Sequence, residues 1–211
     1  MRVIAADLPG SGKSLPQPRT YTTDYYAVDA DAIAALLEAR NATPAIIIGY
    51  SDGGEVALLL SARHPNLVQG VLTWGAAGKI EDASIVEFFR TLIANPTDGA
   101  EGFRDWLLAK YGEEGARATT ESVAVAFSTL LENEGDIALS VANQIMCPTL
   151  LVAGDQDPMI SIASVRALNA RIPNGRVLVI EGGGHALHDT HPALIADTVH
   201  TFLFSLQAYP A

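Results

Sequence analysis

The sequence is poor in cysteine, in basic residues and in long apolar runs. Its single cysteine, Cys147, excludes an intramolecular disulfide, and its position before Pro148 at the start of an apolar segment is typical of a small buried side chain. Only 13 Lys and Arg stand against 24 Asp and Glu, and the net charge of −11 argues against a nucleic-acid partner, because neutralising phosphates requires clustered cations. No apolar run is long enough to span a bilayer, and the N-terminal run is too short for a signal peptide. We therefore expect a cytoplasmic protein with neither a membrane nor a nucleic acid as partner.

What the sequence does have is a regular alternation of short apolar segments with helix-forming ones. Hydrophobic residues make up 49% of its 211 positions, which is enough for one domain with a buried core. Short β-branched runs separated by helices predict an α/β fold with a parallel sheet of about five strands flanked by helices. The strands are expected at residues 2–6, 45–48, 68–74, 149–153 and 176–180.

The junction between the run at residues 45–48 and the next helix carries a serine between glycines. The pattern Gly49-x-Ser51-x-Gly53, in the context of strand, sharp turn and helix, is typical of a nucleophile elbow. A serine on so tight a turn needs neighbours with almost no side chain, since strand and helix pass close to one another. The turn also points the first amides of the helix at whatever the serine attacks, so the Asp52 N–H is the expected oxyanion donor. The alternative is a glycine-rich turn with an idle serine.

Further polar groups follow two downstream strands. Asp155 and Asp157 come after the run at residues 149–153, and His185 comes after the run at residues 176–180. A serine hydroxyl needs a base, and the base needs an orienting acid. Serine, then acid, then histidine is the chain order of the α/β-hydrolase triad, so the order predicts a serine hydrolase.

These motifs make the chain similar to a known superfamily. The segments Gly-Tyr-Ser-Asp-Gly-Gly at 49–54, Gly-Asp-Gln-Asp-Pro at 154–158 and Gly-His-Ala-Leu-His at 184–188 resemble those of α/β-hydrolases. The serine followed by Asp-Gly-Gly is most similar to the biphenyl-hydrolase-like (valacyclovirase) branch of esterases. The resemblance implies a minimal α/β-hydrolase fold with a helical lid insertion.

The resemblance also implies roles for single residues. Ser51 is the implied nucleophile, His185 the base and Asp157 the triad acid, since Asp-Pro at the end of its loop matches the family pattern. Asp155 is the rival for the acid. The implied activity is that of a serine carboxylesterase, which hydrolyses small carboxylic esters through an acyl-enzyme and needs no cofactor.

Substrate contacts are implied by the same branch. There the acid after the nucleophile helps to bind an α-amino group, which makes amino-acyl esters candidate substrates for Asp52. The alternative is an acid that is simply stabilised by the helix dipole. Tyr50, beside the serine, and Trp74, at the end of its strand, are the other expected substrate-binding residues; for Trp74, packing under the lid is the alternative.

The segment that follows residues 2–6 has two interpretations. Gly12-Lys13-Ser14 is similar to the end of a phosphate-binding P-loop, but Asp7 stands where that motif needs a glycine, which argues against nucleotide binding. In hydrolases the pattern Asp-x-x-Gly-x-Gly-x-Ser follows the fourth strand, and residues 7–14 match it at each position. A family member carries three strands and a His-Gly oxyanion motif before this point, and no residue of this sequence matches that motif.

Residues 3–6 are therefore expected to take the place of the third strand. A gap beside the nucleophile strand would leave two rows of backbone donors and acceptors unpaired, so we expect residues 3–6 to pair directly with residues 45–49. The loop that follows would then place the Leu8 N–H beside Ser51 as the second oxyanion donor. The alternative is a truncated chain whose exposed N-terminal strand edge is covered by a second subunit, giving a homodimer.

The alternation of strands and helices stops between residues 78 and 146, where the patterns indicate several amphipathic helices. The superfamily places its lid after the strand that ends at Trp74. The predicted domains are therefore a core of residues 1–77 and 147–211 and a helical lid of residues 78–146.

Three histidines, His185, His188 and His191, follow one another at spacings of three. A glycine-rich loop offers no helix to bring them onto one face, and no carboxylate completes a zinc pattern. We therefore expect no metal.

Other functions share these motifs. A cofactor-free perhydrolase and a C–C hydrolase use the same triad, whereas a serine nucleophile argues against dehalogenases and epoxide hydrolases. Outside enzymes, the alternative is a non-catalytic or near-inactive truncated hydrolase that acts as a ligand-binding domain, because the first oxyanion motif has no match here.

Overall fold

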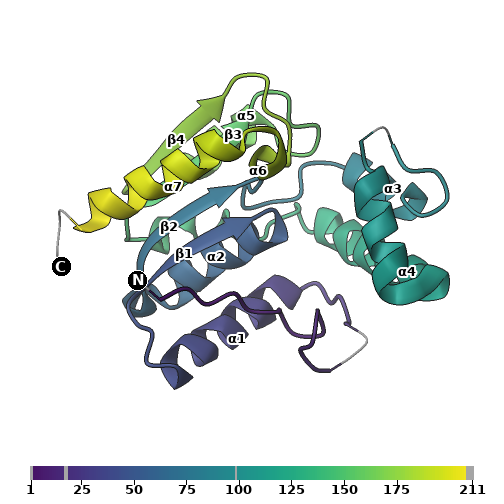
Figure 1. Cartoon of the computed structure of the whole chain (residues 1–211), viewed down its shortest axis with the longest axis horizontal. Coiled ribbons are helices and arrows are strands. Elements are labelled where there is room, and N and C mark those ends of the chain that lie inside the picture. Colours follow the sequence, from purple (N-terminus) through teal and green to yellow (C-terminus); the bar gives the residue numbers. More distant parts are fainter. Residues whose placement is uncertain (1, 17–18, 98, 208–211) are drawn as a thin grey trace. The chain divides into compact units, whose positions relative to one another are not determined.

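The computed structural model describes residues 2–16, 19–97 and 99–207, and Figure 1 shows the course of the chain. Two compact units make up the chain. The helical unit consists of Met1–Tyr25 and Ile80–Asp136, and the sheet unit consists of Tyr26–Lys79 and Ile137–Ala211. The role of residues 78–146 as a lid stays a prediction.

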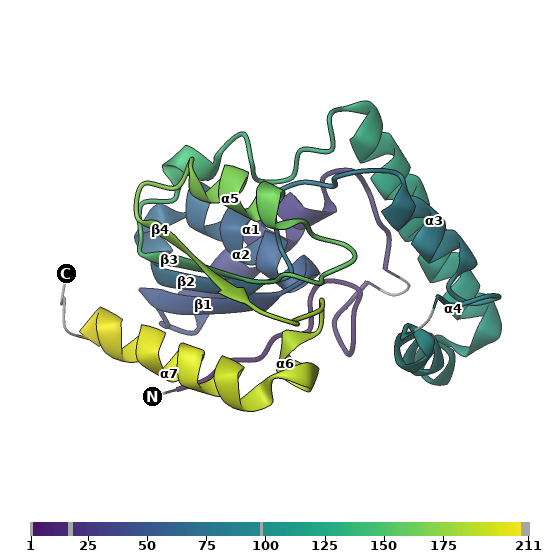
Figure 2. The ribbon, with the colours of Figure 1, turned by 90° about the horizontal axis from the view of Figure 1, so that it is seen from above.

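The sheet unit contains a four-stranded parallel sheet in the order β1-β2-β3-β4. Figure 2 shows α1, α2 and α5 on one face of this sheet and α6 and α7 on the other. The predicted parallel sheet flanked by helices is thus confirmed. The elements are α1 Tyr25–Ala39, β1 Ala45–Tyr50, α2 Asp52–Arg63, η1 Pro65–Leu67, β2 Val68–Trp74, η2 Ala142–Gln144, β3 Thr149–Gly154, α5 Ile162–Asn169, β4 Gly175–Ile180, α6 Leu187–Thr190 and α7 Pro192–Gln207.

One apolar core of the sheet unit lies between the sheet and the helices α6 and α7. Strand β2 is buried along almost its whole length, as expected for a parallel strand that is covered on both faces. Gly70 lets α7 approach, because a Cβ there would lie 2.6 Å from Leu206 Cδ1. The buried members of this core are Leu72, Trp74, Val152, Ile180, Leu187, Ile195, Phe202 and Leu206.

Helix α2 is buried on nearly all sides. Every residue from 54 to 62 is shielded from solvent, including the fully buried Leu58 and Leu60. A helix that is apolar all round belongs to the interior of a protein. The start of α2, directly after Ser51, is therefore held in place by packing along the rest of the helix.

The structure corrects the prediction for the first segment of the chain. Residues 2–7 form no strand, and β1 pairs with β2 alone among the described residues, so the expected pairing of residues 3–6 with residues 45–49 does not form. The exposed fractions of Val3 and Ile4 are 77% and 39%, so the run gains little from burial. Its two alanines also have low strand propensity. Residues 2–7 thus form no strand edge, and the homodimer stays a prediction.

The helical unit is built on α3 (Ser84–Thr91) and α4 (Glu101–Glu132). The rings of Phe89 and Phe127 meet edge to face with their centroids 5.6 Å apart. Helix α4 has two helical parts on either side of a kink at Gly112, whose φ and ψ are 69° and 174°. The linking residues include alanine, glutamate and arginine, which favour helix and let the helix resume directly after the glycine.

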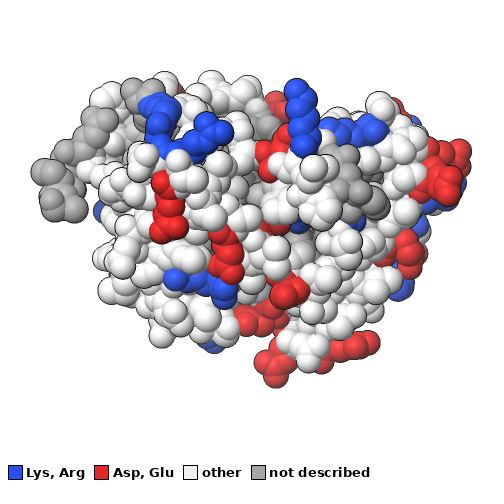
Figure 3. All heavy atoms as spheres, turned by 90° about the horizontal axis from the view of Figure 1, so that it is seen from below, with Lys and Arg blue, Asp and Glu red and all other residues white. Residues whose placement is uncertain are grey.

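Charged side chains are mixed on the surface. On the face drawn in Figure 3, lysine and arginine side chains are interspersed with aspartate and glutamate, and the described residues there form no continuous basic patch. Among the described helices, none combines the length and the apolar character needed to cross a membrane.

Candidate active site

Ser51 stands on the tight turn between β1 and α2. Its φ and ψ of 52° and −121° lie in a region that residues other than glycine rarely adopt. The Ser51 N–H donates to the Trp74 carbonyl of β2 at 2.9 Å, which fixes the turn to the neighbouring strand. Gly49 must lack a side chain, because a Cβ there would lie 2.2 Å from the Gly53 carbonyl oxygen. The turn therefore has the strained, close-packed form expected of a nucleophile elbow.

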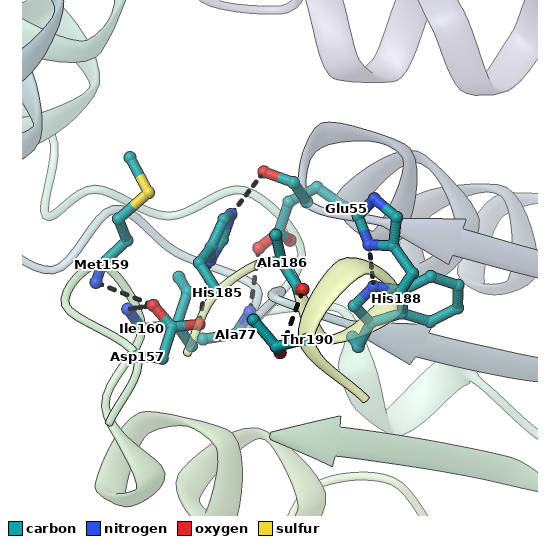
Figure 4. Close-up of polar contacts among 11 residues, drawn as sticks. Glu55, Ala77, Asp157, Met159, Ile160, His185, Ala186, His188 and Thr190 are labelled. Carbon is teal, nitrogen blue, oxygen red and sulfur yellow. Dashed lines mark hydrogen bonds and ion pairs between the residues drawn. The ribbon is translucent and has the colours of Figure 1, made fainter. Parts of the chain in front are cut away.

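His185 joins Ser51 to Asp157 in one line of hydrogen bonds. The Ser51 Oγ lies 3.0 Å from His185 Nε2, and His185 Nδ1 lies 2.9 Å from Asp157 Oδ2 (Figure 4). The side chains of His185 and Asp157 are only 16% and 3% exposed, so the pair is largely shielded from water. A carboxylate that accepts the Nδ1 proton leaves Nε2 as the acceptor for the serine hydroxyl.

The two candidate acids have different partners. Asp157 Oδ1 accepts the N–H groups of Met159 and Ile160 at 2.8 and 3.1 Å, which orients its other oxygen toward His185 (Figure 4). Asp155 Oδ1 instead accepts the N–H of Gly182 at 2.7 Å. Asp157 is thus the acid in contact with the imidazole, whereas Asp155 joins the loop after β3 to the loop after β4.

Two close backbone approaches hold the loops around His185. The Gln156 N–H donates to the Gly183 carbonyl at 2.9 Å, and a Cβ on Gly154 would lie 2.1 Å from that same carbonyl oxygen. Gly75, with a φ of 69°, lies against the imidazole, since a Cβ on it would be 2.8 Å from His185 Cε1. These glycines let three loops meet around one side chain.

Aromatic rings pack beside the imidazole. The centroid of the Tyr50 ring lies 5.2 Å from that of His185, 5.8 Å from that of Trp74 and 4.5 Å from that of His188. The Trp74 indole N–H donates to His188 Nδ1 at 3.2 Å. Burial, together with the nearby carboxylates of the site, raises the pKa of Tyr50 to about 12, so its hydroxyl keeps its proton at neutral pH.

Among the residues expected to bind substrate, Trp74 is 9% exposed and belongs to the apolar core. Its indole N–H serves His188, a contact that the sequence did not indicate. The only signal for His188 in the sequence is its place three residues after His185, a spacing that also occurs in metal sites. Among the described residues, no group of three His, Cys, Asp or Glu side chains could hold a metal ion.

Asp52 and Leu8 were predicted as oxyanion donors. Asp52 is the first residue of α2, and its exposed carboxylate accepts the Tyr26 hydroxyl of α1 at 2.7 Å. Tyr26 was not foreseen, because nothing in its local sequence distinguishes it from a packing residue. Leu8 belongs to the helical unit, where its carbonyl accepts the Ser11 N–H, and its role as a donor stays a prediction.

Known proteins resemble the chain in sequence. Serine hydrolase BPHL of Mus musculus is 29% identical over 189 residues, which cover 88% of this chain and 64% of the mouse protein. A pimeloyl-[acyl-carrier protein] methyl ester esterase of Chromobacterium violaceum is 30% identical over 210 residues, covering 90% of this chain and 78% of that protein. The chain thus spans less than two thirds of the length of the mouse relative. The match to BPHL confirms the resemblance to the biphenyl-hydrolase-like branch.

Solved structures show the same fold. A meta-cleavage product hydrolase from Pseudomonas fluorescens IP01 superposes with a TM-score of 0.70 at 19% identity, over 94% of this chain and 78% of that one. A thermophilic esterase from Thermogutta terrifontis gives a TM-score of 0.66 at 20% identity, again over 94% and 78%. The family model described as "Alpha/beta hydrolase family" matches residues 1–198. With this match and the arrangement of strands and loops described above, the chain belongs to the alpha/beta hydrolase family.

Proposed function

We propose that this chain is a serine carboxylesterase that hydrolyses small carboxylic esters through an acyl-enzyme. The observation that carries the proposal is the hydrogen-bonded line from Ser51 through His185 to Asp157. A hydroxyl, a base within reach of it and an acid that orients the base are the groups that acyl transfer to serine requires. The names of the relatives, a serine hydrolase and a methyl ester esterase, support an ester as the substrate.

In the first half of the proposed reaction, His185 Nε2 takes the hydroxyl proton as Ser51 Oγ attacks the ester carbonyl carbon. The imidazolium, oriented by Asp157, then gives that proton to the alcohol oxygen as the carbon–oxygen bond breaks. The alcohol leaves, and the acyl group stays on the serine. In the second half, His185 Nε2 takes a proton from water as the water oxygen attacks the acyl carbon. The imidazolium then returns this proton to Ser51 Oγ as the bond between the acyl carbon and Oγ breaks, which releases the acid.

The negative charge that develops on the carbonyl oxygen needs donors. The Asp52 N–H at the start of α2 is the first donor in the proposal, because helix amides and the helix dipole both favour an anion there. The Leu8 N–H is the proposed second donor. Loss of one such donor typically costs about 10²–10³ in rate.

Labelling with a fluorophosphonate tests the nucleophile directly. We expect one covalent adduct per chain by intact-mass analysis, located on Ser51 by peptide mapping and abolished in Ser51→Ala. Ser11→Ala is the matched control, since it removes a serine from the glycine-rich loop of residues 7–14 and should leave labelling unchanged. A folded wild-type protein that takes up no label would contradict the proposal and favour the ligand-binding alternative.

A narrower candidate substrate is an amino-acyl ester. The observation in its favour is the hydrogen bond from Tyr26, which holds the Asp52 carboxylate beside the nucleophile turn. A carboxylate held in this way suits an α-amino group, and a charge-assisted hydrogen bond contributes about 1.5–3 kcal/mol.

The comparison of kcat/KM for phenylalanine p-nitrophenyl ester and for its des-amino analogue tests this candidate. Asp52→Asn keeps the backbone amide and should lower the first value by ~10–100-fold while leaving the second near wild type. Tyr26→Phe should give a smaller loss of the same kind. An equal loss for both esters would assign Asp52 to catalysis or folding rather than to the amino group.

A further inference from the structure

A buried carboxylate lies one helical turn after the nucleophile. Glu55 of α2 is only 4% exposed. Its Oε1 accepts the N–H of Ala77 at 2.9 Å (Figure 4). The Gly78 N–H donates to Oε1 and Oε2 at 3.0 and 3.1 Å. Removing a carboxylate from water is costly unless hydrogen bonds compensate for it. An apolar residue at this position of α2 would make none of these hydrogen bonds. The role of Glu55 therefore lies in the two amides that it holds.

The amides that Glu55 binds belong to the loop that follows β2, residues 75–78. The same loop packs on α2 through Ala76, since a Cβ on Gly54 would lie 2.8 Å from the Ala76 Cβ. At its other end, Gly75 contacts the His185 ring so closely that a Cβ would reach 2.8 Å from Cε1. The loop of residues 75–78 thus lies against the His185 imidazole at one end and packs on α2.

Hydrogen bonds hold both the N–H and the carbonyl of Gly78. Its N–H donates to Glu55, and its carbonyl accepts the N–H groups of Ile137, Ala138 and Leu139 at 3.0, 2.8 and 3.0 Å. The chain leaves the sheet unit after Lys79 and returns to it at Ile137. The carboxylate therefore anchors the point at which the chain leaves the sheet unit for residues 80–136 and returns from them.

We propose that Glu55 is a positioning residue for His185, acting through the loop of residues 75–78. The carboxylate holds the amides of Ala77 and Gly78, these hold the loop, and the Gly75 backbone keeps the imidazole oriented between Ser51 and Asp157. The inference rests on the proposed function, because it concerns the orientation of the base in that reaction. Helix α2, which follows Ser51, would in this way also support His185.

Substitution of Glu55 should therefore affect reactivity beyond its effect on folding. Glu55→Ala removes the acceptor for two buried amides and frees the loop, and small displacements of catalytic groups cost up to ~100-fold in rate. Glu55→Gln keeps an oxygen at the place of Oε1, which accepts both amides, and should restore most of the function. Val165→Ala, in the buried part of α5, is the control for lost stability alone.

The test measures the rate constant of fluorophosphonate labelling, and kcat and KM for p-nitrophenyl acetate, well below each variant's melting temperature. We expect Glu55→Ala to lower the labelling rate and kcat by ~10–100-fold with KM nearly unchanged. Glu55→Gln and Val165→Ala should stay within a few-fold of wild type. If Glu55→Ala does not fold, Gly75→Ala takes its place. The added methyl group presses on the His185 imidazole while Glu55 is kept, so this variant should also be labelled more slowly.

Two results would overturn the inference. One is a folded Glu55→Ala or Gly75→Ala variant that is labelled at the wild-type rate. The other is a Val165→Ala variant that loses as much reactivity as Glu55→Ala, which would show that stability alone is involved. A wild-type protein that takes up no label is a separate outcome, because it contradicts the proposed function itself.

Discussion

Strand β1 with the turn at Ser51 and the segment of residues 2–14 look alike in sequence and differ in structure. Each is a short apolar run followed by a loop rich in glycine and serine. Residues of β1 pair along β2 from Ala45 to Tyr50, whereas residues 2–7 form no strand. An apolar run becomes a strand only where a neighbour pairs with its backbone and other elements cover its side chains.

The loops after the two runs also differ in what holds them. The turn at Ser51 is tied to Trp74 of another strand. The loop of residues 7–14 has contacts that are close along the chain: the Lys13 N–H donates to Asp7 Oδ2 and the Ser14 hydroxyl donates to the Asp7 carbonyl, both at 2.8 Å, and the Arg19 guanidinium donates to the Pro9 carbonyl. Contacts between distant segments are what bring a base and an acid to a serine.

The largest loss of kcat is expected from a substitution in the turn after β1. Ser51→Ala should lower kcat for p-nitrophenyl acetate by ~10⁴–10⁶, because the nucleophile itself is lost. Ser11→Ala, in the loop of residues 7–14, should change kcat less than about twofold, because surface substitutions usually have small effects. Equal effects of the two substitutions would show that the turn after β1 has no special chemistry.

The next effect separates the two aspartates of the loop after β3. Asp157→Asn should reduce kcat by ~10²–10⁴, because the imidazole loses the acceptor that selects its tautomer. Asp155→Asn weakens only the link to Gly182 and should cost less than about tenfold. Retained turnover in the first variant together with loss in the second would reverse the assignment.

A smaller effect is expected from the loop of residues 7–14. Leu8→Pro removes the backbone N–H and should lower kcat by ~10²–10³ if that group stabilises the oxyanion. Leu8→Ala keeps the N–H and should remain near wild type. Circular dichroism of both variants checks folding, and a folded Leu8→Pro variant with full activity would remove Leu8 from the site.

The smallest effect concerns stability and compares the two apolar runs directly. Ile46 of β1 packs against the core under α6 and α7, so Ile46→Ala should lower the free energy of unfolding by about 2 kcal/mol. Val3→Ala should change it by less than ~0.5 kcal/mol, since the Val3 side chain is 77% exposed. Urea denaturation of both variants measures the difference. A cost for Val3→Ala equal to that for Ile46→Ala would mean that residues 2–6 are buried after all.

The sequence by itself determined the fold class and named the residues of the candidate site. Local patterns of strands, sharp turns and glycines allowed three residues to be predicted, each after an apolar run: Ser51, Asp157 and His185. The choice of Asp157 over Asp155 needed a family pattern, since both acids follow the same strand two residues apart. The expectation for residues 2–6 was wrong, because a four-residue apolar run looks the same whether or not a neighbour pairs with it.

Only the tertiary structure decided which distant side chains support these groups. Tyr26 reaches Asp52, Trp74 reaches His188, and Glu55 binds the loop after β2, yet none of these pairs has a local signature. The physical reason is that each contact joins segments more than twenty residues apart, and its geometry depends on how helices and strands pack rather than on spacing along the chain. The residues of the candidate site follow from local sequence, whereas the orientation of their side chains follows from the packed structure.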